Sequence, residues 1–447
     1  MLNKFLYKSY RFFHVWEINW RRRFTGSGFF VVFILILTSV LGVDTTRNMI
    51  YQVFSFVLIL SIISIIWGVY YKVNCEVRRC LPKFVTAGEN FHYSIEVKNK
   101  NDHFEKDLML FEKLQDPRPS FEDFLNAREP GEEKRNIWDR KTMYFRWLWI
   151  IRQNLKAVIH EHKIPDISPG DTVNIKVTAK PVCRGYVFFD SVMIARPDPF
   201  RLFKAYRKIK KKQKLLVLPK RYALPHFQIP GSRKYNSGGV AFASAIGNSN
   251  EFLSLREYRP GDSIRNIHWK SWAKTGDLII KEYQDEYFTR HALILDTFHE
   301  QPYSRIFEEA VSIASSFACK LETEESILDL MFVGNEAYTV SSGRGLASTD
   351  KMLEVLSCVQ AAEEKNFSQL LSVVEKYAAR LSGSICIFID WDENRSQLIE
   401  ILKTQGVPVR AFIVTDTKKE CELKLGDNIN DVTVIDVHHV QEGLMLI

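Results

Sequence analysis

Residues 291–322, HALILDTFHEQPYSRIFEEAVSIASSFACKLE, place an apolar strand directly before an amphipathic helix. Residues 291–296 form the apolar run, and residues 304–322 repeat apolar side chains every three or four positions, which is typical of a helix with one buried face. The alternation continues to the end of the chain, so residues 290–447 are predicted to form a doubly wound parallel sheet with helices on both faces. The further predicted elements are strands at 326–333, 384–390, 407–414 and 431–437, and helices at 350–360, 367–380 and 394–406.

Two carboxylates follow strands of this predicted sheet. Asp296 and Asp390 each end an apolar strand, and Asp392 lies two residues further on. Because ligands of such sheets bind beyond the carboxyl ends of the strands, Asp296 and Asp390 are candidate ligands for Mg²⁺ or Ca²⁺. The alternative is that they cap loops or helices and bind nothing. No glycine-rich phosphate loop follows any strand, so we expect no cofactor, with a divalent cation as the alternative.

Two uncharged apolar runs, residues 24–43 and 48–71, lie near the N-terminus. Each is long enough to cross a bilayer core of about 30 Å as a helix. A cleaved signal peptide fits poorly because the second run follows the first at once, and soluble core helices fit poorly because both runs are apolar on every face. Residues 1–72 are therefore predicted to form a tail and a transmembrane hairpin.

Cations flank this predicted hairpin on both outer sides, so the chain is expected in the cell membrane with both termini and its soluble domains in the cytoplasm. Seven scattered cysteines without a CxxC pair agree with a reducing compartment. The flanking cations are Lys4, Lys8, Arg11, Arg21, Arg22 and Arg23 before the first run, and Lys72, Arg78, Arg79 and Lys83 after the second.

Residues 73–220 alternate apolar and polar side chains between turn signals, which predicts a small antiparallel β-sandwich. Residues 117–163 are an aromatic-rich insertion, either an extra hairpin covering the sandwich or a segment lying on the membrane surface. Residues 205–214, AYRKIKKKQK, carry six cations and no acid. They are predicted to form a solvated hairpin tip, or to contact anionic membrane lipid at about 1 kcal/mol per cation. The run contains only one Tyr for stacking on bases, and the net charge of the chain is a moderate +8, so a nucleic-acid partner is not indicated.

The densest stretch of the chain is EFLSLREYRPGDSIRNIHWKSWAKTGDL, residues 251–278, within a junction at 221–289. Pro260-Gly261-Asp262 predicts a turn, with Asp262 or Ser263 capping a helix that ends near Thr275-Gly276. In that helix Ile264 with Ile267, and Trp269 with Trp272, are expected to anchor it to a neighbour. A network of charge-assisted hydrogen bonds is expected among Arg256, Glu257, Arg259, Asp262 and Arg265.

Catalysis is not indicated, because no Ser or Cys near His268 has the spacing of a nucleophile with its base and orienting group, and His160, His162, His438 and His439 lack a third ligand at zinc-site spacing. The stretch is instead predicted to join two domains, to dock a partner, or both. The candidate residues for these roles are Arg256, Glu257, Tyr258, Pro260, Gly261, Asp262, Arg265, His268, Trp269 and Lys270.

The run LREYRPGDSIRNIHWKSWAKTGDLIIKEY, residues 255–283, resembles the signature of domain-of-unknown-function family 58. The stretches at 183–192, 198–204 and 215–220 are similar to further family elements, with Arg201 where Gly is usual. His268 stands where the family often has Asp. In 296–300, Asp296 is kept but both serines of a metal-binding Asp-x-Ser-x-Ser are missing.

The resemblance implies a multidomain chain with two N-terminal transmembrane helices, a β-sandwich-like domain, and a C-terminal α/β domain resembling von Willebrand factor A (Rossmann-like). It implies no catalytic reaction. Such proteins are encoded with MoxR-type AAA+ ATPases, so we expect a bacterial membrane-anchored adaptor or assembly factor that binds such an ATPase. The alternative is a metal-dependent enzyme or sensor that uses Asp296 and Asp390.

Overall fold

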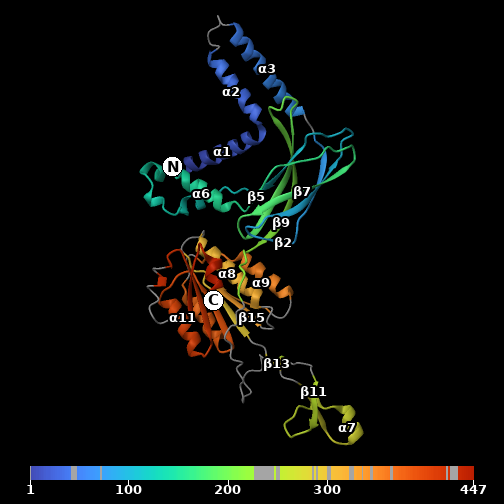
Figure 1. Cartoon of the computed structure of the whole chain (residues 1–447), viewed down its shortest axis with the longest axis vertical. Helices are drawn as coiled ribbons and strands as arrows, with labels where there is room; N and C mark the ends of the chain where they lie inside the picture. Colours follow the sequence, from blue (N-terminus) through green and yellow to red (C-terminus); the bar gives the residue numbers. More distant parts are fainter. Residues whose placement is uncertain are drawn as a thin grey trace. The chain divides into compact units, whose positions relative to one another are not determined.

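The computed structural model contains two compact units, Met1–Lys220 and Arg221–Ile447 (Figure 1). The structure describes residues 2–41, 48–70, 73–225, 246–247, 252–283, 286–287, 290–299, 304–321, 327–334, 336–342, 346–362, 366–418, 421–422 and 431–446.

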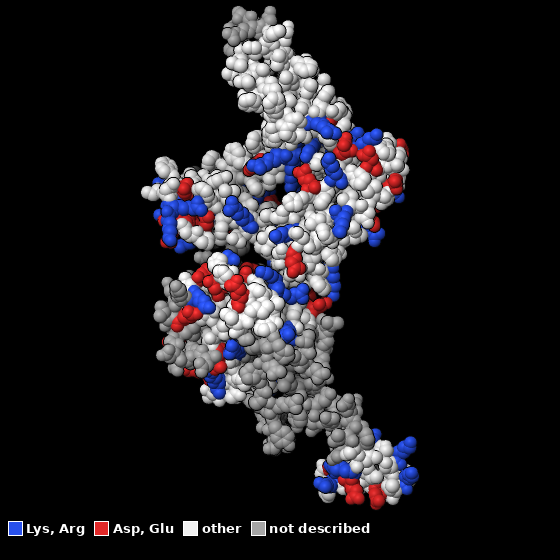
Figure 2. Space-filling view, viewed as in Figure 1, with Lys and Arg blue, Asp and Glu red and all other residues white. Residues whose placement is uncertain are grey.

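Three helices open the first unit: α1 (Leu2–Arg23), α2 (Gly26–Leu41) and α3 (Asn48–Tyr70). α2 and α3 pack against each other (Figure 1), and their surface carries no charged side chains (Figure 2). Among the described residues, one helical stretch is long and apolar enough to cross a membrane, Met49–Gly68. The 16 residues of α2 are also apolar, but they reach only about 24 Å at 1.5 Å per residue. Residues 44–47, which separate the two predicted spans, lie outside the described residues.

The insertion at 117–163 is mostly helical, so the prediction of an extra hairpin is wrong. Ser120 and Asp123 form a reciprocal capping box, and the side chain of Asn136 accepts from the backbone N–H of Asp139 at the start of the next helix. The helices bury Phe124, Met143, Trp147 and Ile150 around Tyr7 of α1. The elements are α4 (Phe121–Asn126), η1 (Glu132–Lys134), α5 (Ile137–Thr142), α6 (Tyr144–Asn154), β5 (Ala157–Ile159) and β6 (His162–Lys163).

A β-sandwich forms the rest of the first unit. One sheet has the order β1-β3-β7-β5 and the other β2-β9-β8-β4-β6. Alternate side chains point inward, as in the buried–exposed pattern of β1, and fill a single core between the sheets. The strands are β1 (Cys75–Cys80), β2 (Phe84–Thr86), β3 (Phe91–Asn99), β4 (Met109–Leu114), β7 (Thr172–Pro181), β8 (Gly185–Pro197) and β9 (Lys204–Leu218).

The turn between β8 and β9 contacts the first residues of α2. Asp198 accepts hydrogen bonds from the backbone N–H groups of Leu202 and Phe203, at 2.6 and 2.9 Å. Arg201 has φ 55°, a backbone conformation that favours glycine. Glycine is also the residue expected at this position from the family resemblance. A methyl group added to Gly28 would lie 2.1 Å from the carbonyl oxygen of Leu202, so this close approach requires glycine.

The second unit contains a six-stranded sheet of order β16-β15-β14-β17-β18-β19. All neighbours pair in parallel except the edge strand β16, which is antiparallel to β15 and which the sequence pattern did not predict. Helices α8, α9 and α13 pack on one face, and α10 and α11 on the other, as the prediction of helices on both faces requires. The strands are β14 (Arg290–Leu295), β15 (Ile327–Val333), β16 (Ala337–Ser342), β17 (Gly383–Phe388), β18 (Val409–Thr415) and β19 (Val432–Asp436). The helices are α8 (Arg305–Leu321), α9 (Leu346–Cys358), α10 (Ser368–Ala378), α11 (Glu393–Thr404) and α13 (Val440–Met445).

Candidate functional site

The signature stretch folds as a strand pair that carries a short helix. β11 (Phe252–Glu257) and β12 (Ile279–Tyr283) pair in antiparallel fashion. The predicted continuous helix is instead a 3₁₀ turn, η2 (Ile264–Asn266), followed by α7 (Trp269–Thr275). The predicted end of the helix is confirmed, because Gly276 adopts the left-handed conformation that terminates α7.

An arginine–aspartate clasp closes the loop between β11 and η2. The Arg256 guanidinium donates two hydrogen bonds to the Asp262 carboxylate, at 2.6 and 2.7 Å. The backbone N–H of Arg259 donates to the same carboxylate at 2.8 Å. The hydrogen bonds from Arg256, followed by that from Arg259, lower the pKa of Asp262 from 3.8 to about 2. This bidentate clasp, with Gly261 at φ +107°, fixes the loop that the sequence predicted as a turn.

The apolar side chains of this stretch divide into a buried pair and an exposed group. Ile267 is 7% exposed and Ile280 is 3% exposed, and the two residues form an isolated antiparallel β-bridge. The expected pairing of Ile264 with Ile267 on one buried face is wrong, because Ile264 lies in the 3₁₀ turn and is 68% exposed. Trp269 and Trp272 contact each other edge to face, with ring centroids 5.7 Å apart, and remain 56% and 43% exposed.

The other predicted residues of this stretch are half-buried or exposed. Tyr258 and His268 are half-buried, and their backbone N–H groups donate to the carbonyl groups of Leu278 and Ile279. His268 Nδ1 lies 2.6 Å from Ser271 Oγ within the first turn of α7. The backbone carbonyl of Glu257 accepts a hydrogen bond from Arg256. Glu257, Pro260, Gly261, Arg265 and Lys270 are exposed.

Sequence reasoning missed Leu255 and Leu278, which add to the exposed apolar surface and are 42% and 40% exposed. Alternation along β11 places Leu255 on the face opposite its half-buried neighbours Ser254 and Arg256, which is the signal that identifies it once the strand is recognised. We refer to Leu255, Ile264, Trp269, Trp272 and Leu278 as the apolar signature surface.

The two aspartates predicted at the strand ends differ in environment. Asp296 is fully buried and pairs with the Arg395 guanidinium, with Arg395 Nε 2.7 Å from its carboxylate. It also accepts backbone hydrogen bonds from Phe298 and Ile389. Asp390 is exposed and accepts from the backbone N–H of Trp391. Asp392 caps the N-terminus of α11, and its carboxylate forms a second ion pair with the Arg395 guanidinium.

This arrangement does not favour a cation at Asp296. Burial raises the pKa of Asp296, while the facing guanidinium opposes that shift. A buried carboxylate already paired with a fixed cation has little remaining affinity for a second one. The neighbouring Thr297 donates its hydroxyl hydrogen to the carbonyl of Val333. Across the described ranges no group of three His, Cys, Asp or Glu residues has a metal-binding arrangement, and the metal site stays a prediction.

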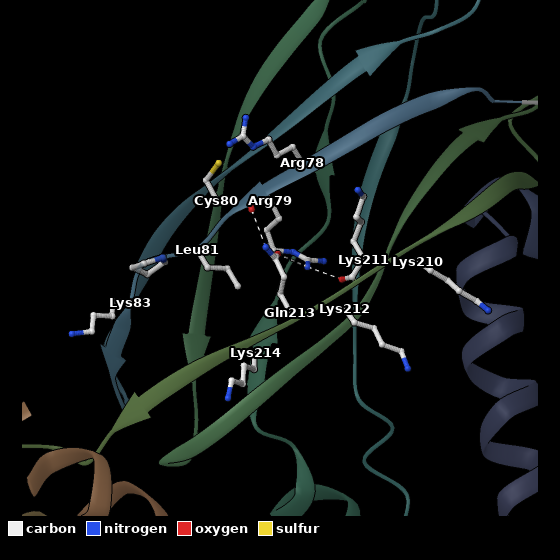
Figure 3. A pocket seen from close by; sticks show the side chains of 11 residues that line it. Arg78, Arg79, Cys80, Leu81, Lys83, Lys210, Lys211, Lys212, Gln213 and Lys214 are labelled. Atoms are coloured by element: carbon white, nitrogen blue, oxygen red, sulfur yellow. Dashed lines mark hydrogen bonds between the residues drawn. The ribbon is translucent and has the colours of Figure 1, made fainter. Parts of the chain in front are cut away.

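The basic run at 205–214 lies in β9 and is not a hairpin tip, which corrects that prediction. Lys211 and Lys212 form a bulge opposite Asp190, because Phe189 pairs with Gln213 and Ser191 with Lys210. The buried Arg79 guanidinium donates to the carbonyl of Lys211 at 3.0 Å (Figure 3). It also pairs with Glu112 at 2.6 Å. The cations line a hollow of about 780 Å³ that includes Arg78, Lys83, Lys210, Lys211, Lys212 and Lys214.

The position of this hollow explains its charge without a ligand. β2 pairs with β9 only at Leu216–Leu218, so in the described part of the sandwich residues 204–214 form a sheet edge. Lysine side chains and bulges on edge strands prevent pairing with other chains. The contact with anionic lipid expected for 205–214 stays a prediction.

Comparison with known proteins supports the resemblance drawn from the signature. Residues 254–434 match the family described as "Protein of unknown function DUF58". The chain is 24% identical over 251 residues to the "Uncharacterized protein YeaD" of Bacillus subtilis (strain 168), a match that covers 56% of this chain and 60% of that protein. The chain thus matches less than two thirds of this relative's length. The region belongs to the DUF58 family, and the prediction made from the signature is confirmed.

Solved structures add little to this assignment. A mutant of Salmonella alpha-2-macroglobulin matches over 35% of this chain and 8% of that chain, with 10% identity and a TM-score of 0.19. Part of native alpha-2-macroglobulin from Escherichia coli matches over 35% of this chain and 20% of that chain, with 7% identity and a TM-score of 0.19. Similarity at this level carries no argument about fold or function.

Proposed function

We propose that the chain is a non-enzymatic, membrane-anchored adaptor that binds a protein partner through its signature stretch. In this proposal α2 and α3 form a two-span hairpin, with both termini and both soluble parts in the cytoplasm. The length and apolar character of α3, the apolar character of the shorter α2, and the cations that flank the two runs support this topology. The second unit takes the role of a domain resembling von Willebrand factor A, in agreement with its open, mostly parallel sheet.

The observation that carries the proposal is the apolar signature surface. Five large apolar side chains, including two tryptophans, are between 40% and 68% exposed within one short segment. Soluble proteins rarely leave such clusters uncovered without a function, and tryptophan is enriched at the energetic centres of protein interfaces. The Arg256–Asp262 clasp holds the loop before η2 in place, so little conformational entropy is lost when a partner binds.

The partner we propose is a MoxR-type AAA+ ATPase, which is what membership of the family implies. The charge of the second unit is compatible with a protein partner that presents cations, since residues 221–447 contain 23 Lys and Arg against 32 Asp and Glu. Residues 1–220 contain 38 against 21, so the basic character of the chain belongs to the membrane-bound unit.

A crosslinking pull-down of the full-length chain from native membranes tests this proposal. Wild type is compared with the double variant Trp269→Ala and Trp272→Ala, and both are checked by thermal unfolding. We expect the wild type to capture a AAA+ ATPase and the folded double variant to capture at least tenfold less, because truncation of central interface tryptophans costs about 2 kcal/mol or more each.

The matched control is Trp138→Ala, because Trp138 is 77% exposed but lies in α5 of the first unit. Capture by this variant is expected to equal capture by wild type. Equal capture by wild type and the signature variant would contradict the proposed role of the apolar signature surface.

A further inference from the structure

Helix α1 presents three distinct faces. At 3.6 residues per turn, its residues fall into three arcs whose centres are about 120° apart. One arc contains Leu6, Tyr7, Tyr10 and His14, a second contains Lys4, Lys8, Arg11 and Arg22, and a third contains Leu2, Phe5, Phe12, Phe13 and Trp16.

The first arc is fixed against the insertion helices. The Tyr7 hydroxyl donates to the carbonyl of Pro119 at 3.1 Å, and the Tyr10 hydroxyl donates to the carbonyl of Thr142 at 2.9 Å. The Tyr7 ring contacts Trp147 edge to face, with centroids 5.8 Å apart. These contacts set the rotation of α1 about its own axis, so the direction of the other two faces is determined by the fold.

The third arc is apolar and exposed. Phe5, Phe12 and Phe13 are 67%, 65% and 60% exposed, and Leu2 and Trp16 are 62% and 50% exposed. α1 therefore packs on its own unit through the first arc. Its third arc remains a stripe of five large exposed apolar side chains. Such a stripe requires a partner that is itself apolar.

Continuity with α2 indicates what covers this stripe. α1 ends at Arg23 and α2 begins at Gly26, and the exposed side chains continue from α1 into α2 with Phe29, Phe30 and Phe33. Trp16 belongs to a residue type that favours the boundary between lipid and water, and a row of cations runs beside the apolar stripe. An apolar stripe bordered by cations is the pattern of a helix that lies in the plane of a membrane surface.

We infer that α1 lies in the cytoplasmic lipid interface, with Phe5, Phe12, Phe13 and Trp16 inserted among the acyl chains near the head groups. Lys4, Lys8 and Arg11 lie at head-group level, where anionic lipids attract them. The insertion helices pack on the first arc, about 120° around α1 from the inserted side chains, and are held close to the membrane by α1. This inference rests on the proposed membrane anchor, because without spans in α2 and α3 no bilayer is present beside α1.

Quenching by labelled lipids tests the inference on the full-length chain in vesicles. An environment-sensitive fluorescent amino acid replaces one residue at a time: Phe12 on the apolar arc, Lys8 on the basic arc, and Ile59, which is 57% exposed in α3. Vesicles containing phosphatidylglycerol carry quenchers attached either near the head group or deep in the acyl chain. We expect the shallow quencher to reduce emission at Phe12 at least twofold more than at Lys8, and the deep quencher to act mainly at Ile59.

The Ile59 position separates failure of this inference from failure of the anchor. Quenching at Ile59 with equal, weak quenching at Phe12 and Lys8 would overturn the interfacial placement of α1 and leave the anchor intact. Absence of quenching at all three positions would overturn both. Protection of Phe12 from lipid-borne and aqueous quenchers alike would show that a protein covers the stripe, which also overturns the inference.

A second variant guards against an effect of the fluorophore itself. Phe12→Glu combined with Phe13→Glu changes only exposed side chains, so folding of the insertion cluster is expected to persist. With the fluorophore at Phe5, this double variant is expected to lose at least half of the shallow quenching. The control Lys4→Gln, on the basic arc, is expected to retain most of it. Unchanged quenching in the glutamate variant would contradict the inference.

Discussion

Two arginine–aspartate pairs in the second unit show how burial decides the role of the same chemistry. The Arg395–Asp296 pair lies at the carboxyl ends of the parallel strands, with side chains 7% and 0% exposed. The Arg256–Asp262 pair lies in the signature stretch, with side chains 31% and 20% exposed. The buried pair fixes the fold and occupies the place where a cation was predicted. The partly exposed pair shapes a loop beside an uncovered apolar surface.

The difference teaches that a carboxylate at a strand end is not a metal ligand until its partners are known. Asp296 and Asp390 look equivalent in the sequence, because each ends an apolar strand. The distinguishing residue is Arg395, almost one hundred positions after Asp296, which lies within the first turn of α11.

The largest expected effect comes from breaking the buried pair. Arg395→Ala leaves the Asp296 carboxylate buried without its cation, and such a loss costs about 3–5 kcal/mol of unfolding free energy. Denaturant unfolding of the full chain in detergent measures it. The control Asp390→Ala, at an exposed carboxylate, is expected to change stability by less than about 0.5 kcal/mol. A cost for Arg395→Ala below about 1 kcal/mol, or recovery of the lost stability on adding Mg²⁺, would contradict this account and favour a cation at Asp296.

The sandwich offers a second buried pair that sharpens the comparison. Arg79 and Glu112 both have fully buried side chains, and burial raises the pKa of Glu112 against the effect of Arg79. Arg79→Ala is expected to cost about 3 kcal/mol and to loosen the bulge in β9. Arg78→Ala, at the exposed neighbouring position, is the control and is expected to cost less than about 0.5 kcal/mol. Equal effects of the two substitutions, measured by the same unfolding experiment, would contradict the account.

An exposed pair marks the other end of the comparison. Arg201 lies 3.8 Å from Asp107, and both side chains are more than two-thirds exposed, so this ion pair contributes little. The left-handed backbone conformation of Arg201 affects stability more than the ion pair does. Arg201→Gly is therefore expected to raise the unfolding free energy by up to about 1 kcal/mol. Arg201→Ala keeps the strain and removes the ion pair, and is expected to be nearly neutral. A clear loss of stability in the glycine variant would show that the guanidinium matters more than the backbone.

The smallest effect on stability is expected at the Arg256–Asp262 clasp, and this effect depends on pH. The pKa of Asp262 is lowered from 3.8 to about 2 in the folded chain, so the clasp contributes stability above pH 3.8. That contribution falls as the pH decreases through the window from 3.8 to about 2. Hydrogen exchange at the Arg259 amide, which donates to Asp262, is expected to lose protection in this window. Asp262→Asn removes the titrating group, so in this variant the protection of the Arg259 amide should not change between pH 3.8 and about 2. Loss of protection centred near pH 4 in wild type would contradict the lowered pKa.

The sequence predicted the second unit well because its strands and helices have clear hydrophobic periods. The helices at 350–360 and 367–380 correspond to α9 and α10, and the strand at 384–390 to β17. The edge strand β16 was missed, since Ala337–Ser342 carries few large apolar residues and pairs on one side only.

The insertion was predicted wrongly for a physical reason. Aromatic residues from 143 to 159 are so dense that no period distinguishes helix from strand, and the deciding signals were the helix caps at Ser120 and Asn136. The tail before the first apolar run also proved helical, as α1, and its packed face became recognisable only once the insertion helices were in place. In the signature, the separate 3₁₀ turn at Ile264–Asn266 exposed a side chain that helical spacing had placed on a buried face.

The measurement that tests the central claim most directly is site-specific photocrosslinking in native membranes. A photoreactive amino acid replaces Trp269 in one sample and the more exposed Trp138 in another, within the full-length chain. The account predicts a strong adduct with a AAA+ ATPase from position 269 and at most a weak one from position 138. Equal adducts from the two positions, or none from position 269 in a chain that remains folded and membrane-bound, would contradict the claim that the apolar signature surface binds the partner.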